Sequence, residues 1–487
     1  MKTGLRVIKN SISLMGGQGY GIMINLLATA IIARYLPLEV FGDYGFILAI
    51  CMTFSVVTDM GTNQIMIREI ARDKDRSLEI FSSGFMLNVL LSFLTVGLIT
   101  VVIHLTTESQ HIINATYILT IAILIYMLGD NFDIVFKAHE QMKYNAYSKI
   151  IEETTYIAAI ITVVMLDLGL YGIFFAYLFA YTTRFIVGYL FTRSKFFKPQ
   201  LKWNLPVMKW IFRESFPIGL SRIFRKTTFR IDTILLKLLR TRAEVGVFHG
   251  VYRFIIIAIF IPRDITDSVF PIMSRYAAGS RESITALFQK SFKIILILTI
   301  PMIFTVFMAS DRIITLILGS NFAHAAPLMQ LLTLAWGVMF FSVLCNKILN
   351  ATNNQRLATI AIGICLIVNV IIDLITIPLY GYIGAGIATL TSEIVLFILS
   401  YIFISKYVCN MSLGKVVFKP FVAALAAAVA GLILGGSHVL FTILINFIVY
   451  ISLLFFLGVF KDGELDIMKE IAYKIRRKIR KIEILGG

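Results

Sequence analysis

Long apolar runs separated by short polar segments dominate this chain of 487 residues. Each run holds roughly 20 residues with few charges, about the length that an α-helix needs to cross the hydrocarbon core of a bilayer. We therefore predict an all-α polytopic membrane protein. The pattern predicts about fourteen spans, over residues 11–34, 43–65, 80–104, 112–136, 146–167, 170–192, 214–238, 246–270, 287–309, 325–349, 357–378, 381–405, 416–435 and 438–460.

Composition agrees with this pattern and excludes a soluble fold. Hydrophobic residues make up 58% of the chain, charged residues only 15%, and the mean hydropathy is +0.85. The six histidines form no ligand-spaced pair, so we expect no metal site and no cofactor. Cysteines lie in or near apolar runs without paired spacing, which predicts buried thiols at Cys51, Cys345, Cys365 and Cys409.

The basic residues predict the orientation of the chain. Most of the 45 Lys and Arg residues fall in alternate loops that begin with the N-terminal segment. The opposite loops carry only Arg34, Lys237, Arg240, Arg242 and Arg312. Because cytoplasmic loops are enriched in Lys and Arg, we expect a multi-pass protein of the cell (inner) membrane with both termini in the cytoplasm.

One predicted span, 214–238, carries an unusual number of charges. Its cations at helical spacing are Arg222, Arg225, Lys226 and Arg230, and Asp232 follows them. The alternative is an amphipathic helix lying on the membrane surface. That alternative reverses the side of every later loop and places the basic C-terminus outside, so we predict that the segment crosses.

The four cations oppose insertion, since each costs about 2.5–3.5 kcal/mol at the centre of a span. At about 100° per residue they share one stripe of the helix. Such a stripe must face a water-filled cavity or partner acids inside the bundle. Buried ion pairing, for example with Asp232, is the structural alternative, but the local excess of positive charge is too large for complete pairing.

Internal repeats indicate how the helices are grouped. The aligned segments are EVFGDYG (39–45) with EVGVFHG (244–250), AHEQMK (138–143) with ATNNQR (351–356), and GLYGIFFA (169–176) with GYIGAGIA (381–388). They predict two six-helix lobes related by an axis along the membrane normal. The predicted divisions are an N-terminal lobe (1–200), a C-terminal lobe (201–410), an additional helix pair (411–460) and a basic amphipathic cytoplasmic tail (461–487).

The first lobe lacks the cationic stripe, which favours a functional role for it. At an offset of about 204 residues, the four cations align with Gln18, Gly21, Ile22 and Leu26. The glycines of the repeats are expected to allow turns and close helix packing. In the tail, isoleucines recur every three or four residues among cations, which predicts a helix on the inner leaflet. A disordered basic tail is the alternative.

Two motifs in this setting carry a resemblance to a known family. LPLEVFG (36–42) and IPLYGYIGAGIATLTSE (377–393), within two six-helix lobes, resemble the polysaccharide transporters of the multidrug/oligosaccharidyl-lipid/polysaccharide (MOP) exporter superfamily. The resemblance implies a V-shaped pair of lobes around a central cavity that works by alternating access. It also implies a flippase that moves a polyprenyl-pyrophosphate-linked oligosaccharide, such as an O-antigen, capsule or exopolysaccharide repeat unit, to the outer leaflet.

Residue chemistry agrees with a pyrophosphate substrate, because Arg offers forked donors to phosphate oxygens and Lys adds a point charge. The predicted pyrophosphate ligands are Arg222, Arg225, Lys226, Arg230 and Arg253. Arg184 and Arg263 are candidates for a gate or for the place where substrate enters the cavity, with structural ion pairing as the alternative.

Several acids in predicted spans could bind H⁺ or Na⁺ and couple transport to an ion gradient. These candidates are Asp59, Asp232, Asp373 and Glu393, and pairing with a nearby cation is the alternative for each. A second group, which we expect near a cytoplasmic gate or the lipid headgroups, comprises Asp130, Asp133, Glu152 and Glu153.

Other functions fit the residues less well. A flippase for a lipid-linked peptidoglycan precursor is the nearest alternative, because its substrate presents the same pyrophosphate. A multidrug or cation antiporter of the same superfamily would need acids and aromatics in its cavity. An enzyme is not expected, because the loops are short and the sequence offers no catalytic pair. The net charge of +17 follows cytoplasmic loops rather than a nucleic-acid-binding face. Expected partners are the lipid-linked oligosaccharide, membrane lipids and polysaccharide polymerase machinery.

Overall fold

The computed structural model describes residues 2–459 except 260–261, 264–265, 267–272, 274–280, 410–413 and 435–438. The regular elements of these residues are all helices, as predicted. They are α1 (Lys2–Tyr35), α2 (Leu38–Phe54), α3 (Val56–Asp59), α4 (Thr62–Arg72), α5 (Ser77–Thr106), α6 (Gln110–Ala138), α7 (Met142–Met165), α8 (Gly169–Lys195), α9 (Leu205–Thr228), α10 (Ile231–Leu239), α11 (Arg242–Ala258), α13 (Arg281–Met308), α14 (Ser310–Leu318), the 3₁₀ helix η1 (Ser320–Ala325), α15 (Ala326–Ala351), α16 (Gln355–Tyr380), α17 (Tyr382–Tyr407), α18 (Gly414–Leu434) and α19 (Val439–Phe456). The predicted tail, 461–487, lies outside the described residues.

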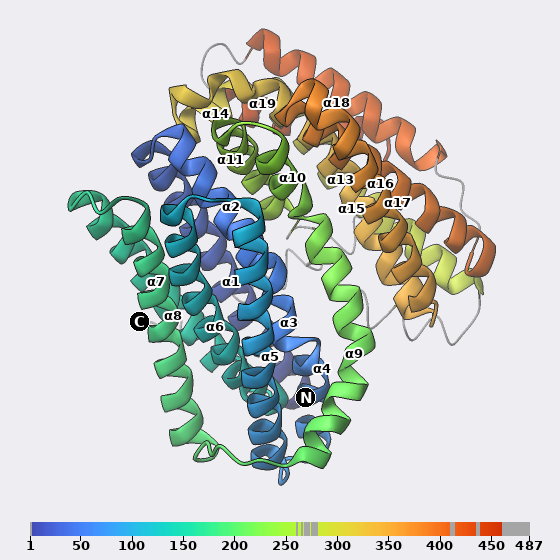
Figure 1. Ribbon diagram of the computed structural model, residues 1–487. Coiled ribbons are helices and arrows are strands. Elements are labelled where there is room, and N and C mark those ends of the chain that lie inside the picture. Colours follow the sequence, from blue (N-terminus) through green and yellow to red (C-terminus); the bar gives the residue numbers. More distant parts are fainter. Residues whose placement is uncertain are drawn as a thin grey trace, which may run out of the picture.

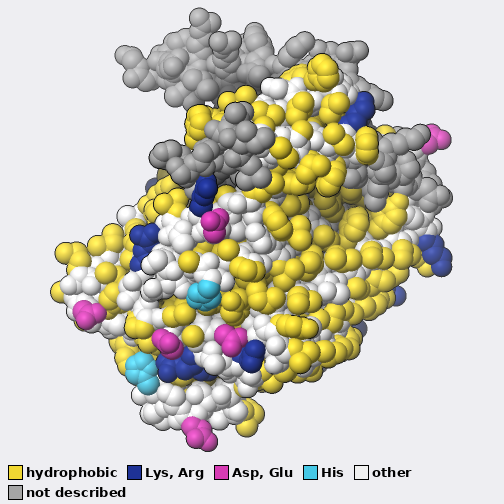
Figure 2. All heavy atoms as spheres, turned by 90° about the horizontal axis from the view of Figure 1, so that it is seen from above, with side chains coloured by type: hydrophobic (Ala, Val, Ile, Leu, Met, Phe, Trp, Pro, Cys, Tyr) yellow, Lys and Arg dark blue, Asp and Glu magenta, His cyan; other side chains and the backbone are white. Residues whose placement is uncertain are grey.

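The length and apolarity of the helices confirm a polytopic membrane protein. Within the described ranges, nine helical stretches are long and apolar enough to cross a membrane. Other predicted spans, such as α7 with Lys149, Glu152 and Glu153, carry more charge. Seen from the end where α2 meets α11, hydrophobic side chains cover much of the surface and the charged ones are few (Figure 2). This distribution is the one that a lipid-facing protein needs.

The helices form two lobes, as Figure 1 shows. In the first lobe, α6 and α7 pack against α8, and α1 packs along α7. In the second lobe, α15 and α16 pack against α17, and α13 packs along α15. The extra pair, α18 and α19, packs together and lies against α13. Apolar residues from both lobes form one continuous buried cluster, so the lobes share a core where they meet.

Closest contact between the lobes occurs where the repeat-related helices α2 and α11 cross. A Cβ atom added at Gly42 would overlap the carbonyl group of Arg242, and one added at Gly45 would overlap the ring of His249. The His249 ring also stacks edge-on against Tyr44, with 5.6 Å between centroids. The absence of a Cβ at these glycines therefore allows the backbones to approach, as expected for glycine at helix crossings.

Backbone geometry supports the other two repeats. Glu140 and Asn353, which the alignment pairs, are both left-handed, with φ of 56° and 60°. Gly169 and Gly381 are paired as well, with φ of 61° and 57°. Each of these glycines lies at the junction that starts the next helix, where a positive φ favours glycine. The matched segments thus make the same turns in both lobes.

Two predicted spans are not the continuous helices that we expected. Within 214–238, α9 ends at Thr228 and α10 begins at Ile231, with Arg230 outside the helical region at φ −133°. Neither glycine nor proline marks this break. Its physical reason is tertiary: both helices pack against α16, but α9 also packs against α3, α4 and α5 of the first lobe, whereas α10 also packs against α2, α11 and α17. The chain changes direction where it passes between its two sets of partners.

The other corrected span is 43–65, which is divided among α2, α3 and α4. Met60 and Gly61 both adopt positive φ, of 38° and 83°. At this break the backbone of α9 passes very close, because a Cβ atom on Gly219 would lie 2.5 Å from the Met60 carbonyl oxygen. The break in the first lobe and the crossing of α9 are therefore one structural feature.

Candidate substrate-binding site

Four of the five predicted pyrophosphate ligands lie near one another between the lobes. Arg222 and Lys226 project from α9, Arg230 lies at the α9–α10 break, and Arg253 projects from α11. Lys226 is close enough to Arg222 and Arg230 to be repelled by both, and Arg230 is similarly close to Arg253. All four side chains keep part of their surface exposed. We call these four residues the cationic cluster.

The fifth predicted ligand, Arg225, lies on a different side of α9. It interacts electrostatically with Glu393 of α17 and with Arg263. Its neighbour Phe224 packs on Ala361 and Cys365 of α16. The expected single stripe therefore divides, with Arg225 facing the second lobe. Neither Arg225 nor Arg230 forms an ion pair within 4.0 Å with any residue of the described part.

Arg222 contacts an acid of the first lobe. Its Nη1 lies 2.7 Å from Oδ2 of Asp59, whose other oxygen accepts a 3.0 Å hydrogen bond from the Gly61 N–H. Asp59 is thus held by the helix break and offers one oxygen to α9. Lys226 Nζ donates to Ser55 Oγ at 3.3 Å, again across the lobes. Asp59 is therefore paired with a cation, Arg222, which is the alternative to ion binding that we considered for this acid.

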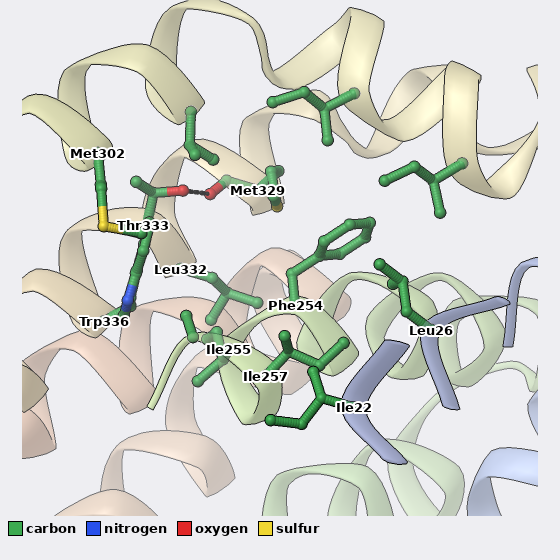
Figure 3. Close-up of a pocket in the computed structure, with 14 residues that line it drawn as sticks. Ile22, Leu26, Phe254, Ile255, Ile257, Met302, Met329, Leu332, Thr333 and Trp336 are labelled. Atoms are coloured by element: carbon green, nitrogen blue, oxygen red, sulfur yellow. Dashed lines mark hydrogen bonds between the residues drawn. The ribbon is translucent and has the colours of Figure 1, made fainter. Parts of the chain in front are cut away.

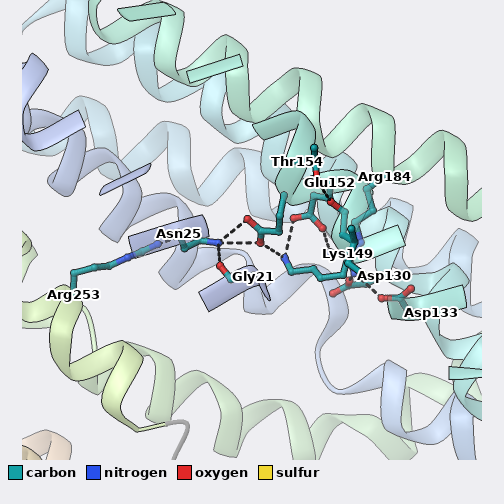
Figure 4. A network of polar contacts seen from close by, with 11 residues as sticks. Gly21, Asn25, Asp130, Asp133, Lys149, Glu152, Thr154, Arg184 and Arg253 are labelled. Carbon is teal, nitrogen blue, oxygen red and sulfur yellow. Dashed lines mark hydrogen bonds and ion pairs between the residues drawn. The ribbon is translucent and has the colours of Figure 1, made fainter. Parts of the chain in front are cut away.

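Arg253 is connected to a polar network in the first lobe, which Figure 4 shows. Its Nη2 donates to Asn25 Oδ1 at 2.8 Å, and Asn25 Nδ2 donates to Glu153 Oε2 at 2.8 Å. Lys149 Nζ then lies 2.7 Å from Glu153 Oε1 and 3.0 Å from Glu152 Oε1. Sequence reasoning missed Asn25 and Lys149. Two signals were available in the sequence. Asn25 is an amide in an apolar span, and Lys149 precedes Glu152 and Glu153 by three and four residues, which is the spacing of neighbours on a helix.

Arg184 occupies the far end of this network. It is 5% exposed and pairs with Asp130 at 2.5 Å, Asp133 at 2.6 Å and Glu152 at 3.1 Å. Its guanidinium carbon also lies 4.4 Å from the centroid of the Tyr126 ring. Three of the four acids that we grouped near a gate are therefore gathered around one buried cation, and the fourth, Glu153, pairs with Lys149. These contacts correspond to structural ion pairing, the alternative that we considered for Arg184. A role of Arg184 as a gate stays a prediction.

Two of the four candidate ion-coupling acids meet in the second lobe. Asp232 of α10 faces Asp373 and Asn369 of α16, and Thr389 of α17 donates to Asp232 Oδ2 at 2.7 Å. Asp373 is fully buried, and neither of its oxygens has a hydrogen-bond partner among the described residues. Two facing carboxylates without a cation repel each other strongly. We call Asp232, Asn369, Asp373 and Thr389 the buried acid pair site. Glu393, also buried, lies one turn beyond Thr389 on α17 and interacts electrostatically with both Asp232 and Arg225.

A third charged contact closes the α2–α11 end, and sequence reasoning did not single it out. Asp43 of α2 is 1% exposed and accepts hydrogen bonds from Arg242 Nε, at 2.9 Å, and from Arg242 Nη2. Lys237 Nζ of α10 lies 3.4 Å from the same carboxylate. The signal available was Asp43 itself, the second acid of the EVFGDYG repeat, which lies within a predicted span. The predicted buried thiols are confirmed, since all four cysteines are free and buried.

The described helices define a multi-pass membrane protein with two helical lobes and a charged interior. Residues 7–277, more than half of the chain, match the family described as "Polysaccharide biosynthesis protein", and the chain belongs to that family. Residues 255–456 also match the family "Lipid II flippase MurJ". The resemblance inferred from the sequence is therefore confirmed.

Individual relatives agree with this membership. The chain is 25% identical over 179 residues to the "Probable low-salt glycan biosynthesis flippase Agl15" of Haloferax volcanii, a match that spans 37% of this chain and 38% of that relative. In fold it resembles "Lipid II flippase MurJ, inward closed conformation", with a TM-score of 0.74, 15% identity, and coverage of 92% of this chain and 98% of that one. It also resembles an inward-facing multidrug resistance MATE family transporter, with a TM-score of 0.69, 14% identity, and coverage of 82% and 98%.

Proposed function

We propose that this protein is a flippase that moves a polyprenyl-pyrophosphate-linked oligosaccharide from the inner to the outer leaflet by alternating access. The observation that carries the proposal is the cationic cluster, with two cations on α9, one at the α9–α10 break and one on α11, where the two lobes meet. Each central cation is unfavourable in a span, so a cluster of four favours a negatively charged ligand. Membership of a polysaccharide biosynthesis family supports a glycan-bearing lipid.

The contacts of the cluster suggest how it would hold a pyrophosphate. Arg222 and Arg253 each touch a polar group of the first lobe, Asp59 and Asn25 respectively. Arg230 has no such partner within the described residues, and Lys226 has only a long contact to a hydroxyl group. An incoming pyrophosphate would therefore bind Arg230 and Lys226 first and would compete with Asp59 and Asn25 for the two remaining guanidinium groups.

Orientation follows from the distribution of basic residues. The loops predicted outside include those that join α1 to α2 and α10 to α11, so the α2–α11 crossing would lie at the outer end of the molecule. Asp43 binds Arg242 and Lys237 there. This arrangement corresponds to a state closed to the outside, with both termini cytoplasmic.

We further infer that the buried acid pair site binds H⁺ or Na⁺. Asp232 lies only two residues after Arg230 and on the same short helix as Lys237. Neutralising Asp232 and Asp373 would remove their repulsion and stabilise the packing of α10 against α16 and α17. Because α10 begins directly after Arg230 of the cationic cluster, occupancy of the acid site would alter the position of that substrate ligand.

Reconstitution tests the proposal directly. The full chain would be placed in vesicles with a fluorescent polyprenyl-pyrophosphate-linked saccharide, and transfer between leaflets would be followed by access of a membrane-impermeant quencher. We expect Arg230→Gln and Arg253→Gln to slow transfer at least tenfold, whereas Lys195→Gln, an exposed cation at the end of α8, leaves it unchanged. Unchanged transfer in both cluster variants overturns the assignment of the cluster.

A second candidate substrate is a lipid-linked peptidoglycan precursor. The match of residues 255–456 to the family "Lipid II flippase MurJ" favours it. The two substrates carry the same pyrophosphate and differ in the saccharide. Deletion of the gene separates them, because a complete polysaccharide repeat unit should accumulate on its carrier under the main proposal. Accumulation of the peptidoglycan precursor instead would support the second candidate.

A further inference from the structure

An apolar pocket lies beside the cationic cluster, between α1 of the first lobe and α11, α13, α14 and α15 of the second. Its volume is about 520 Å³. Figure 3 shows the residues around it. They include Ile22 and Leu26 of α1, Phe254 and Ala258 of α11, and Leu332 and Trp336 of α15. This size is within the range of about 300–1,000 Å³ that is typical of small-molecule sites.

Chemistry of the lining excludes a polar ligand. Among the described lining residues, Thr333 has the only hydroxyl group, and it donates to the Met329 carbonyl of its own helix at 2.7 Å. The other polar group there is the Trp336 indole N–H, which has no hydrogen-bond partner in the described part of the chain. None of the described lining residues is charged. A ligand that fills this site must therefore be mainly hydrocarbon.

The position of the pocket identifies which hydrocarbon. Phe254 in the pocket wall directly follows Arg253 of the cationic cluster, and Leu26 directly follows Asn25, to which Arg253 donates. The contact between α1 and α11 thus includes both Arg253, a proposed ligand of the phosphate, and part of the wall of the apolar pocket. In a polyprenyl pyrophosphate, the hydrocarbon chain is bonded directly to the phosphate. A phosphate at Arg253 would therefore place the start of its lipid chain beside this pocket.

We propose that this pocket binds the polyprenyl chain of the substrate while the cationic cluster binds its pyrophosphate, a proposal that rests on the function proposed above. An ordinary phospholipid fits the position less well. Its phosphate remains at the membrane surface, whereas Ile22 and Leu26 lie in the interior of the span Gly16–Tyr35. Several lining residues keep part of their surface exposed, including Ile22, Leu26, Phe254 and Ala258, so a chain can reach the pocket without unfolding the contact between α1 and α11.

The pocket contains its own spectroscopic reporter. The chain has three tryptophans. Trp203 lies just before α9 and is 63% exposed, and Trp210 lies in α9 and is 39% exposed. Changing Trp203→Phe and Trp210→Phe leaves Trp336 as the sole tryptophan of the full chain. In nanodiscs of phospholipid with brominated acyl chains, the bromine atoms quench a tryptophan that they touch. Unbrominated polyprenyl pyrophosphate should displace these chains and restore the fluorescence of Trp336.

Ala258→Phe fills the pocket without adding polarity and should weaken this recovery about tenfold, which corresponds to about 1.4 kcal/mol. The matched control is Ala159→Phe, in a second apolar hollow on the outside of α7 and α8, which should leave the recovery unchanged. Inorganic pyrophosphate should restore nothing, and neutral polyprenol should restore part of the signal. Absence of recovery with both polyprenol and polyprenyl pyrophosphate, or an equal effect of both alanine variants, overturns the pocket.

The same experiment separates this proposal from the proposed function. If Arg253→Gln weakens recovery by polyprenyl pyrophosphate while Ala258→Phe does not, the cationic cluster stands and the pocket is wrong. If polyprenol and polyprenyl pyrophosphate restore the fluorescence at equal concentrations, and Arg253→Gln changes neither, the pocket stands and pyrophosphate binding by the cluster is wrong. Reduced recovery in both Arg253→Gln and Ala258→Phe supports pyrophosphate binding by the cluster and polyprenyl binding by the pocket together.

Discussion

Asp43 on α2 binds the guanidinium group of Arg242 on α11 through both of its carboxylate oxygens, although the two residues are 199 positions apart. The carboxylate is almost completely buried beneath the α2–α11 crossing. A second cation, Lys237, approaches the same carboxylate from α10. Helix α2 of the first lobe is therefore joined to α10 and α11 of the second at one acid, and opening of this end must break that contact.

Replacing this acid should weaken the closed end. The Arg242 side chain is 48% exposed, so its ion pair with Asp43 is partly screened and its loss costs about 1 kcal/mol, while Asp43→Asn retains only a neutral acceptor. We expect faster amide hydrogen exchange in α2 and α11 of Asp43→Asn, measured by mass spectrometry on the purified protein. Asp311→Asn, an exposed acid on α14, is the control and should exchange like the wild type. Unchanged exchange at α2 would show that this contact does not hold the end closed.

Gly219, where α9 crosses the α3–α4 break, should not tolerate replacement by a larger residue. In Gly219→Ala, the new methyl group meets the backbone of Met60, which cannot move aside as a side chain can. We expect a loss of about 1–3 kcal/mol, as for other overpacked sites, and a lower unfolding temperature. Gly363→Ala on α16 is the matched control, since its Cβ meets no atom within 4 Å. There, helix propensity predicts a gain of about 0.8–1.0 kcal/mol. Equal unfolding temperatures for the two variants would contradict the close approach of α9 to the Met60 backbone at Gly219.

Asp59 should act as a competitor of the substrate phosphate for Arg222. In Asp59→Asn, the amide oxygen can still accept from the Gly61 N–H, so the helix break persists, but the negative charge is lost. Because the Arg222 side chain is 39% exposed, its pair with Asp59 is screened and contributes about 1 kcal/mol or less. We expect binding of inorganic pyrophosphate, measured by calorimetry, to strengthen up to about fivefold and to lose this gain at high salt. Weaker binding in Asp59→Asn would show that Asp59 positions Arg222 for the ligand instead.

Arg184 should be essential for folding rather than for ligand contact. Arg184→Gln leaves Asp130, Asp133 and Glu152 without their shared cation, and a buried acid that loses its partner costs about 3–5 kcal/mol. We expect a strongly reduced yield of folded protein by size-exclusion fluorescence. The triple neutral variant with Asp130→Asn, Asp133→Asn and Glu152→Gln added should recover much of that yield. Normal folding of Arg184→Gln alone would return Arg184 to its predicted role as a gate.

The buried acid pair site should make stability depend on a bound ion. A ligand that binds only the folded state at 100 times its dissociation constant stabilises that state by about 2.7 kcal/mol. We therefore expect Na⁺ or mild acid to raise the unfolding temperature of the wild type. In Asp373→Asn this dependence should disappear, because an amide can donate to Asp232 directly. A wild type whose unfolding temperature responds to neither Na⁺ nor pH would rule out ion binding at this site.

Sequence alone determined the properties that follow from local chemistry. The length and apolarity of the runs predicted helices that cross a membrane, and the repeats located turns whose left-handed residues, Glu140 and Asn353, recur in both lobes. It also identified the cations of the 214–238 segment, since four charges in one span are conspicuous wherever they point. These features depend on a residue and its near neighbours in the chain.

Tertiary structure decided the features that depend on distant partners. The α9–α10 break has no local signal, because it results from packing of α9 against α3, α4 and α5 and of α10 against α11 and α17, with α16 in contact with both. The direction of Arg225, and the meeting of Asp232 with Asp373, follow from where α16 and α17 lie. The apolar pocket has no sequence signature at all, since its walls are ordinary apolar residues of five helices. Charge and hydropathy are properties of single residues, whereas pairing and enclosure arise only when separate helices are brought together.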